Sequence, residues 1–241
     1  MSLMHTWRSS RLDLPLVISP AECAGETYIV TGSNTGIGLE TVRHLVAQKA
    51  TRVIMAVRSL DRGEAARQGC REFNRRHGRR SSVAFSTSHR TNRSGRSPRE
   101  LSGSTGSMPW CRMRCLRRWT GKPPKDGEQS ITVNVFGTML LAVLLMPHLR
   151  KCSSQFGTTP TISFVGSGMA FSVEGDLRKL DRENIFEDWN NQDKFPMDIR
   201  SMAKLLLLFA VRRLSELAPP DKTGVVLNVE RILGHAETRA W

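Results

Sequence analysis

The feature that most constrains this chain is a glycine turn between an apolar run and a segment of helical periodicity. Tyr28-Ile29-Val30 leads directly into Thr-Gly-Ser-Asn-Thr-Gly-Ile-Gly at residues 31–38. The apolar run predicts a strand, and the segment that continues to about residue 48 predicts a helix. Glycines at this spacing, between a strand and a helix, are typical of a loop that binds a dinucleotide. An ordinary glycine-rich turn is the alternative.

Each glycine has its own expected task in such a loop. Gly32 permits the tight turn, Gly36 lets the backbone approach a pyrophosphate, and Gly38 lets the helix pack close to the strand. The N-terminus of the helix then faces the phosphates. The cofactor-binding residues expected in this loop are Gly32, Ser33, Asn34, Gly36, Ile37 and Gly38.

Arg58 closes a second expected strand, at residues 51–57, and lies 20 residues after Gly38. A domain that binds NAD has an acid near this point to accept from the ribose 2′-hydroxyl. A guanidinium suits a 2′-phosphate instead, so the sequence predicts NADP as the cofactor. Arg62 is a weaker second candidate, and Asp61 leaves NAD as the alternative.

Strand and helix signals alternate in two stretches of the chain. Residues 26–76 contain strand, helix and strand signals, and residues 127–229 continue with further helices and strands. This order predicts an α/β fold with a doubly wound parallel sheet, in one domain over residues 1–241. In the second stretch we expect helices at 131–149 and 202–217 and strands at 161–165 and 224–229.

The segment between these stretches, residues 67–125, is anomalous. Residues 66–125 contain 16 Lys and Arg but two acids, so the whole net charge of +14 lies there. Its periodicity is lost among Arg, Ser, Gly and Thr, and only residues 83–85 hint at a strand. Two interpretations stay open: a disordered basic insert, or a protein sequence altered by a shifted reading frame or a misjudged splice. We favour the second, because the flanking stretches are two halves of one fold.

Five irregularly spaced cysteines argue against a secreted disulfide framework and predict a cytoplasmic protein. Cys111 and Cys115, with two histidines upstream, fit no familiar zinc spacing, so we expect no metal site. The apolar patch at residues 14–18 is too short for a signal peptide, and the apolar run at residues 139–146 is too short to span a bilayer. We therefore expect no membrane partner.

The glycine motif resembles that of the short-chain dehydrogenase/reductase (SDR) family, and residues 53–59 are similar to its fungal retinol-dehydrogenase-like members. Residues 126–138 resemble the helix that contains the family's active-site asparagine. Residues 162–167 resemble the strand that ends in its catalytic serine. The resemblance implies a Rossmann fold and an NADP-dependent oxidoreductase that interconverts a carbonyl and an alcohol.

By this resemblance, the catalytic residues are Ser167, Lys204 and Asn134. Ser167 would hydrogen-bond the substrate carbonyl, Lys204 would also hold the cofactor ribose, and Asn134 would support a proton-relay water. Each residue taken singly also fits a structural role, in a turn, on the surface or within a helix. Their order along the chain favours the family.

The family's catalytic tyrosine is missing. Four residues before Lys204, where the family has this tyrosine, the chain has Arg200, and its only tyrosine is Tyr28. Arginine stays protonated at any workable pH, so it cannot act as the general acid. General acid catalysis is worth roughly 10²- to 10⁴-fold, so we expect a crippled enzyme.

Other family features are missing as well, so the fold is expected to be incomplete. The Asn-Ala-Gly segment of the fourth strand is not found within residues 67–125, which makes that strand doubtful. After Val229 the family's Pro-Gly and nicotinamide loop are replaced by residues 230–234, and the sequence stops at Trp241 before the last strand and substrate lid. Thr238 is a candidate remnant of that loop.

Three functions follow from these features. The first is an NADP-dependent oxidoreductase acting on a small carbonyl or alcohol, in fungal secondary metabolism. The second, which we prefer for the chain as written, is a nucleotide-binding pseudoenzyme or degenerate gene product. The third is an Arg-rich nucleic-acid-binding protein, which the scarcity of aromatics among the arginines argues against. Self-association through the helices that start near Ile131 and Met202 is also expected from the resemblance.

Overall fold

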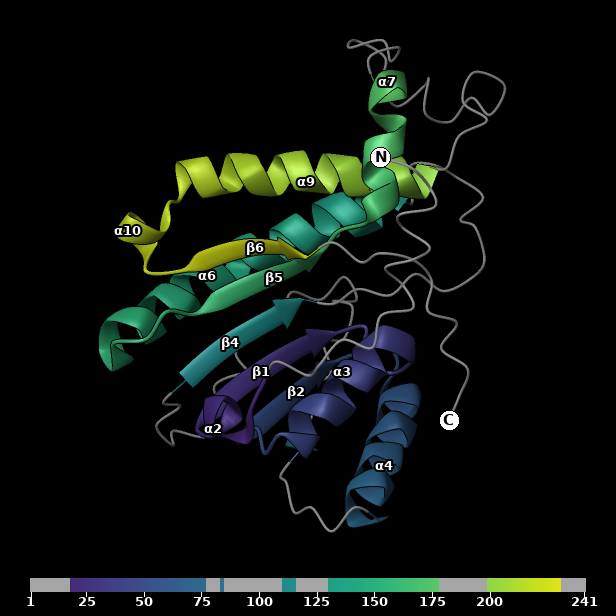
Figure 1. Cartoon of the computed structure of the whole chain (residues 1–241), viewed down its shortest axis with the longest axis vertical. Coiled ribbons are helices and arrows are strands. Elements are labelled where there is room, and N and C mark those ends of the chain that lie inside the picture. The colour runs from purple at the N-terminus through teal and green to yellow at the C-terminus, as the bar shows by residue number, and fades with distance from the viewer. Residues whose placement is uncertain (1–17, 77–82, 85–109, 116–129, 178–198, 231–241) are drawn as a thin grey trace, which may run out of the picture.

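The computed structural model describes residues 18–76, 83–84, 110–115, 130–177 and 199–230. Six parallel strands form one sheet in the order β3-β2-β1-β4-β5-β6 (Figure 1). The chain extends the sheet in one direction from β1 and in the other from β4, so the strand order reverses between them. The strands are β1 (Glu26–Thr31), β2 (Arg52–Ala56), β3 (Val83–Ala84), β4 (Trp110–Cys115), β5 (Thr161–Val165) and β6 (Val226–Glu230).

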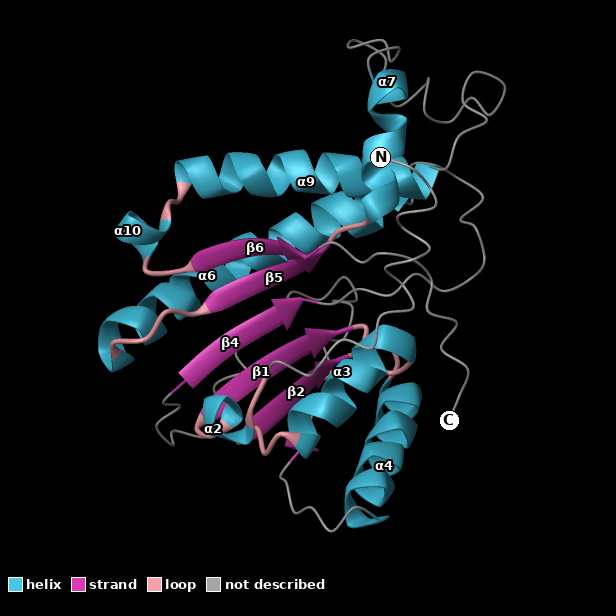
Figure 2. Cartoon of the chain, viewed as in Figure 1, coloured by secondary structure: helices cyan, strands magenta, loops and turns pink. Residues whose placement is uncertain are grey.

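The helices lie on both faces of the sheet (Figure 2). Helices α3 and α4 cover the face beside β1 and β2, and α6 and α9 cover the other face beside β4 and β6. The expected doubly wound Rossmann fold is therefore confirmed. The helices are α2 (Pro20–Cys23), α3 (Gly36–Ala47), α4 (Leu60–Arg76), α6 (Gly137–Phe156), α7 (Glu174–Leu177), α9 (Ile199–Leu217) and α10 (Pro220–Thr223), with a π-helix η2 (Thr132–Phe136) and a 3₁₀-helix η3 (Gly168–Val173).

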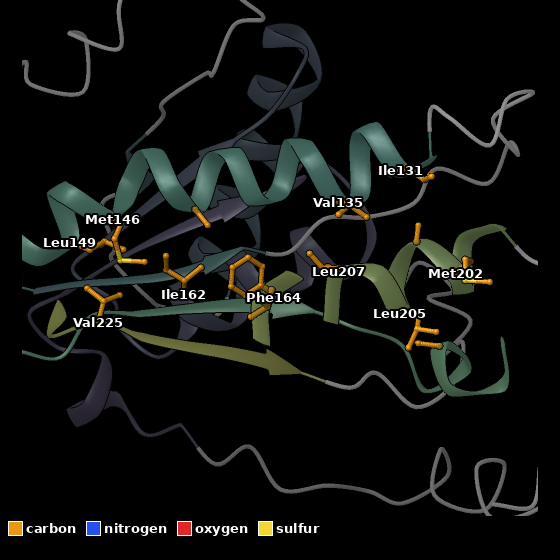
Figure 3. Packing of buried hydrophobic residues seen from close by; sticks show 14 of the residues in the cluster. Ile131, Val135, Met146, Leu149, Ile162, Phe164, Met202, Leu205, Leu207 and Val225 are labelled. Carbon is orange, nitrogen blue, oxygen red and sulfur yellow. The ribbon is translucent and has the colours of Figure 1, made fainter. Parts of the chain in front are cut away.

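Two apolar cores occupy the two faces, because successive side chains of a strand point to opposite sides. In β1, Tyr28 and Val30 are buried with α3, whereas Ile29 packs into the core under α6 and α9. Figure 3 shows this second core, in which Ile162 and Phe164 of β5 lie on the α6 side of the sheet. Burying one such side chain contributes about 1.5–3 kcal/mol.

The fourth strand, which the sequence analysis doubted, is present. Residues Trp110–Cys115 pair with β1 and with β5, so that Met113 lies between Ile29 and Ile162. Helix α4 also runs to Arg76, well into the anomalous segment. The doubt about the fourth strand was therefore wrong, and β3 lies where residues 83–85 hinted at a strand. The remainder of that segment lies outside the described residues.

Helix α6 is longer than the sequence predicted. Pro147 lies inside the helix, which ends only at Phe156, before Gly157 in the left-handed conformation (φ 63°). Together with η2 it spans 25 residues, Thr132–Phe156, whose most apolar window has a mean hydropathy of 1.7 and is 22% buried. Among the described residues, this one helix has the length and composition to cross a membrane. The helix that contains the apolar run at residues 139–146 is thus much longer than that run, whereas the expectation of no membrane partner stays a prediction.

Candidate nucleotide and substrate site

The glycine loop has the geometry of a tight turn at the carboxyl end of β1. Gly32 and Gly36 have φ values of 63° and 53°, a conformation that favours glycine. The Gly32 N–H donates to the Ala56 carbonyl at 2.9 Å, which fixes the loop to the end of β2. A Cβ on Gly38 would lie 2.6 Å from the Gly32 carbonyl oxygen, so the start of α3 leaves no room for a side chain there.

The first turn of α3 presents backbone donors that no side chain caps. Thr35 occupies the N-cap position without a side-chain hydrogen bond, and no acidic residue lies in the first turn. Free N–H groups and the helix dipole together favour a bound anion. Ser33 is fully buried, and its hydroxyl has no hydrogen-bond partner among the described residues. These residues fit the pyrophosphate of a dinucleotide.

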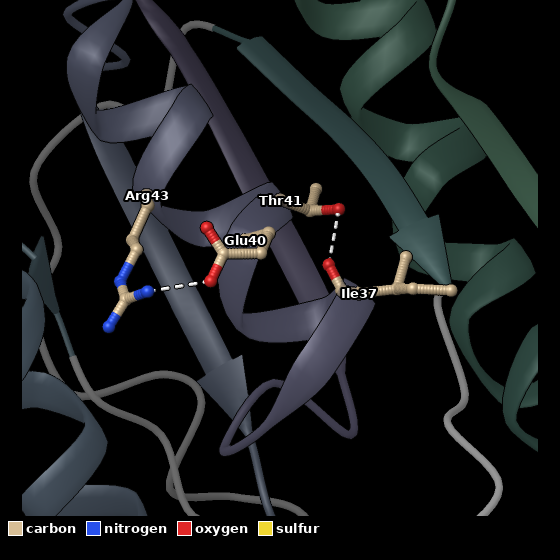
Figure 4. A network of polar contacts seen from close by, with 4 residues as sticks. All are labelled: Ile37, Glu40, Thr41 and Arg43. Carbon is tan, nitrogen blue, oxygen red and sulfur yellow. Dashed lines mark hydrogen bonds and ion pairs between the residues drawn. The ribbon is translucent and has the colours of Figure 1, made fainter. Parts of the chain in front are cut away.

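The remaining loop residues differ in exposure. Asn34 is half-buried and the Ile37 side chain is 44% exposed. Figure 4 shows that the Ile37 carbonyl accepts from the Thr41 hydroxyl at 2.9 Å, and that Arg43 pairs with Glu40 one turn further along α3. These contacts stabilise the helix behind the loop. In Figure 4 the Ile37 side chain points away from Glu40 and Arg43.

Arg58 is exposed, two residues beyond the end of β2. Because Ala56 accepts from Gly32, the arginine follows the strand that holds the glycine loop. The Arg62 backbone N–H donates to the Ser59 hydroxyl at 3.5 Å, at the start of α4. The cation predicted to select a 2′-phosphate thus lies on the same edge of the sheet as the loop, with Asp61 in the first turn of α4 nearby.

Ser167 lies where β5 turns into η3. Its hydroxyl accepts from the Met169 backbone N–H at 3.2 Å and caps that helix. The Gly166 N–H donates to the Glu230 carbonyl at 2.8 Å, so the turn is also tied to the end of β6. The serine is therefore held at the carboxyl edge of the sheet, the edge at which parallel α/β folds bind ligands.

Lys204 reaches the same place from α9. Its ammonium donates to the Val165 carbonyl at 2.6 Å. Asn134 lies in η2 and donates from Nδ2 to the Ser130 hydroxyl at 3.2 Å. Helix α9 packs against both η2 and η3. The structure thus brings together the elements that hold Asn134, Ser167 and Lys204, although these lie far apart in the sequence.

Arg200 is exposed and lies one helical turn before Lys204. Tyr28 cannot replace the missing phenol, because it is 3% exposed in β1 and its hydroxyl donates to Cys23 Sγ at 3.6 Å. The part of the chain that the structure describes therefore contains no tyrosine near Ser167 and Lys204.

Buried thiols lie away from this site. Burial raises the pKa of the Cys70 thiol, and the neighbouring Arg43 guanidinium opposes that rise only in part. Burial also raises the pKa of Cys152, whose sulfur lies 3.7 Å from Nε2 of His148. Neither thiol is activated as a nucleophile. Within the described ranges, no group of three His, Cys, Asp or Glu residues is arranged to hold a metal ion.

Sequence reasoning missed two features of the site. The first is the π-helical turn that holds Asn134, for which the sequence gives no signal. The second is Ser130, whose hydroxyl orients Asn134 and which the sequence does not distinguish from any other helix residue. The buried hydroxyl of Ser33 was expected only as part of the loop.

Known proteins are similar to this chain in sequence and in fold. Residues 26–92 match the KR domain. The chain is 31% identical to the short-chain dehydrogenase anuD of Penicillium roqueforti, over 84% of this chain and 53% of the relative. It is 29% identical to the short chain dehydrogenase/reductase dmxR8 of Cryptosporiopsis sp., over 89% of this chain and 68% of the relative. The chain thus spans about half to two thirds of the length of these curated relatives.

A solved short-chain type dehydrogenase/reductase from Mycobacterium ulcerans has the same fold, with a TM-score of 0.52 and 19% identity over 86% of this chain and 66% of that one. The sheet order and the glycine loop define a Rossmann-type protein with a dinucleotide loop. The chain is thus similar to the short-chain dehydrogenase/reductase family in its sequence and its fold.

Proposed function

We propose that this chain binds NADP(H) and belongs to the oxidoreductases that interconvert a carbonyl and an alcohol, with turnover limited by Arg200. The observation that supports it most is the loop: Gly38 packs on Gly32 while the first turn of α3 stays uncapped beside the buried Ser33 hydroxyl. A polar group buried without a partner costs free energy unless a ligand satisfies it. The loop therefore favours a resident dinucleotide.

The chain's own residues divide the work of holding that dinucleotide. The first N–H groups of α3 bind the pyrophosphate, the exposed Arg58 pairs with the 2′-phosphate, and Lys204 holds the ribose. The dinucleotide supplies or accepts the hydride when it is bound. Ser167 donates its hydroxyl proton in a hydrogen bond to the carbonyl oxygen, and Asn134, oriented by Ser130, supports a water that relays protons.

Arg200 changes the chemistry at the carbonyl oxygen. An alkoxide formed by hydride transfer must receive a proton, and a guanidinium does not release one at neutral pH. The proton must then come from water, which removes a general acid worth roughly 10²- to 10⁴-fold in rate. This residue favours the second candidate function, a nucleotide-binding pseudoenzyme of the same family.

The setting of this activity is also a proposal. The relatives are fungal proteins named as short-chain dehydrogenases, which supports a small-molecule carbonyl or alcohol as substrate and a role in fungal secondary metabolism. We place the protein in the cytoplasm on the basis of its irregular cysteines.

Self-association is the proposed use of the outer face of α6. Five large apolar side chains of η2 and α6 are 37–62% exposed, at the helical spacing that makes one stripe. An exposed apolar patch of this kind marks an interaction site, and a second copy of the chain fits it by the family resemblance. The stripe consists of Val133, Phe136, Leu140, Val143 and Leu144.

The test is a titration of the full chain with NADPH and, separately, with NADH, followed by nicotinamide fluorescence and by the thermal transition. We expect saturable NADPH binding and a raised transition, about 2.7 kcal/mol of added stability at a ligand concentration of 100 times Kd. Arg58→Gln should weaken NADPH binding far more than NADH binding. Arg71→Gln, an exposed arginine on α4, is the matched control. Absence of saturable binding to either nucleotide would contradict the proposal.

A further inference from the structure

Two cations lie one turn apart on the face of α9 that meets the carboxyl end of β5. Residues four apart on a helix are neighbours on its surface, so Arg200 lies beside Lys204. The Lys204 ammonium contacts the Val165 carbonyl at 2.6 Å, two residues before Ser167. This contact places the face of α9 that holds Arg200 and Lys204 over the edge of the sheet at which Ser167 lies. Arg200 is exposed in the first turn of α9.

The polar groups of Arg200, Lys204 and Ser167 can all donate hydrogen bonds. A guanidinium has five N–H donors and no acceptor, and the Lys204 ammonium has three donors. Lys204 donates to Val165 and has a further interaction within the chain. The Ser167 hydroxyl accepts from the Met169 N–H and keeps its own proton to donate. A set of donors with two positive charges suits an oxyanion, and the planar fork of arginine matches two oxygens at once.

The acids near this face are few among the described residues. The first turn of α9 contains none. Glu174 lies on α7, which packs against α9, and Glu230 ends β6 beside the Ser167 turn. Arg200, Glu174 and Glu230 each have a further interaction within the chain. An interaction of Arg200 within the chain is thus the competing use of the guanidinium, and the experiment must separate the two uses.

We propose that Arg200, beside Lys204 and Ser167, binds the oxyanion group of a small ligand, a carboxylate or a phosphate, at the place where a tyrosine-bearing site takes a neutral carbonyl. Ser167 and Lys204 keep their contacts with the carbonyl and the ribose. This inference rests on the proposed function and deepens it, because it names the chemical class of the ligand. A keto acid or a phosphorylated carbonyl compound would offer both the anion and a reducible group.

The probes are malonate and inorganic phosphate, titrated separately into the full chain by calorimetry in low-salt buffer, with and without saturating NADPH. For wild type we expect binding that weakens as KCl is added, since salt screens exposed charges. Arg200→Gln should weaken binding about tenfold or more, as expected for a lost charge-assisted hydrogen bond. Arg200→Lys keeps the charge without the fork and should fall between the two. Arg213→Gln, exposed on the same helix, should bind like wild type.

The outcomes separate the two proposals. The inference would be overturned if wild type and Arg200→Gln bound both probes with equal affinity. It would also be overturned if saturating NADPH abolished probe binding, because the anion would then bind in the pyrophosphate loop. NADPH binding without any probe binding would overturn the inference alone. Arg200-dependent probe binding without NADPH binding would support it and overturn the proposed cofactor. The probe that binds more tightly identifies the ligand's group as carboxylate or phosphate.

Discussion

The Lys204 ammonium donates a 2.6 Å hydrogen bond to the Val165 carbonyl oxygen and so joins α9 to the last residue of β5. Val165 is two residues before Ser167, whose hydroxyl caps η3. The bond therefore sets the spacing between the two residues that the family resemblance assigns to the site. It also orients the helix face on which Arg200 replaces a tyrosine. Each prediction about chemistry at this edge of the sheet depends on that replacement.

Arg200→Tyr should create carbonyl reduction. A phenol one turn before Lys204 can give a proton to the carbonyl oxygen, so we expect the NADPH-dependent rate to rise about 10²- to 10⁴-fold. The measurement is NADPH oxidation with a panel of ketones, aldehydes and keto acids. Arg213→Tyr, on the same helix but away from η3, is the control. An Arg200→Tyr variant that binds NADPH yet reduces nothing would show that more than the tyrosine is missing.

Most of the sheet could be predicted because its strands are short apolar runs flanked by turn residues. The run Thr161–Val165 is a strand with the bounds predicted. Strand β4 was missed because Arg112 and Arg114 alternate with apolar residues inside a basic segment. The alternation has the period of a strand, but the excess of arginine around it argued for disorder.

The ends of the helices and the arrangement of the site were harder to predict from the sequence, for a different reason. Pro147 predicts the end of a helix because it lacks an N–H, yet it lies exposed within α6, where a carbonyl that loses its partner can reach water. Gly157 is the residue that marks the end of the helix.

The glycine loop could be predicted in detail because its constraints are local. The meeting of Asn134, Ser167 and Lys204 could be predicted only by resemblance, because it depends on long-range packing.

Gly38→Ala should disrupt the nucleotide loop. The added Cβ would lie 2.6 Å from the Gly32 carbonyl oxygen, a backbone atom, so α3 or the loop must move. We expect a loss of about 1–3 kcal/mol in the free energy of unfolding and a marked loss of NADPH affinity. Gly69→Ala is the matched control: it lies within α4 with nothing within 4 Å of the new Cβ, and should stabilise by about 0.5–1 kcal/mol. Urea denaturation and NADPH titration of both variants give the comparison, and a Gly38→Ala protein that binds NADPH like wild type would contradict the geometry.

Leu140→Glu combined with Leu144→Glu should dissociate the protein if the α6 stripe joins two copies. Both side chains are at least 60% exposed, so the charges should cost the folded monomer little. Light scattering at several concentrations should give a dimer for wild type and a monomer for the double variant. Gln155→Glu, exposed near the end of α6, should behave as wild type. A wild-type monomer that binds lipid vesicles through this stripe would replace self-association with a membrane surface.

Stability should fall in alkaline solution because of Cys70 and Cys152. Burial raises the pKa of both thiols above the ordinary 9.0, so between 9.0 and the raised pKa the folded chain keeps protons that the unfolded chain has lost. Proton binding is then greater in the native state, and the free energy of unfolding decreases as pH rises, by at most about 1.4 kcal/mol per pH unit for each thiol. Below pH 9 the contribution is complete. Cys70→Ala, measured by urea denaturation from pH 7 to 10.5, should show a shallower alkaline decline than wild type, even if the lost packing lowers stability equally at every pH. An unchanged slope in this variant, and also in Cys152→Ala, would mean that other groups cause the alkaline decline.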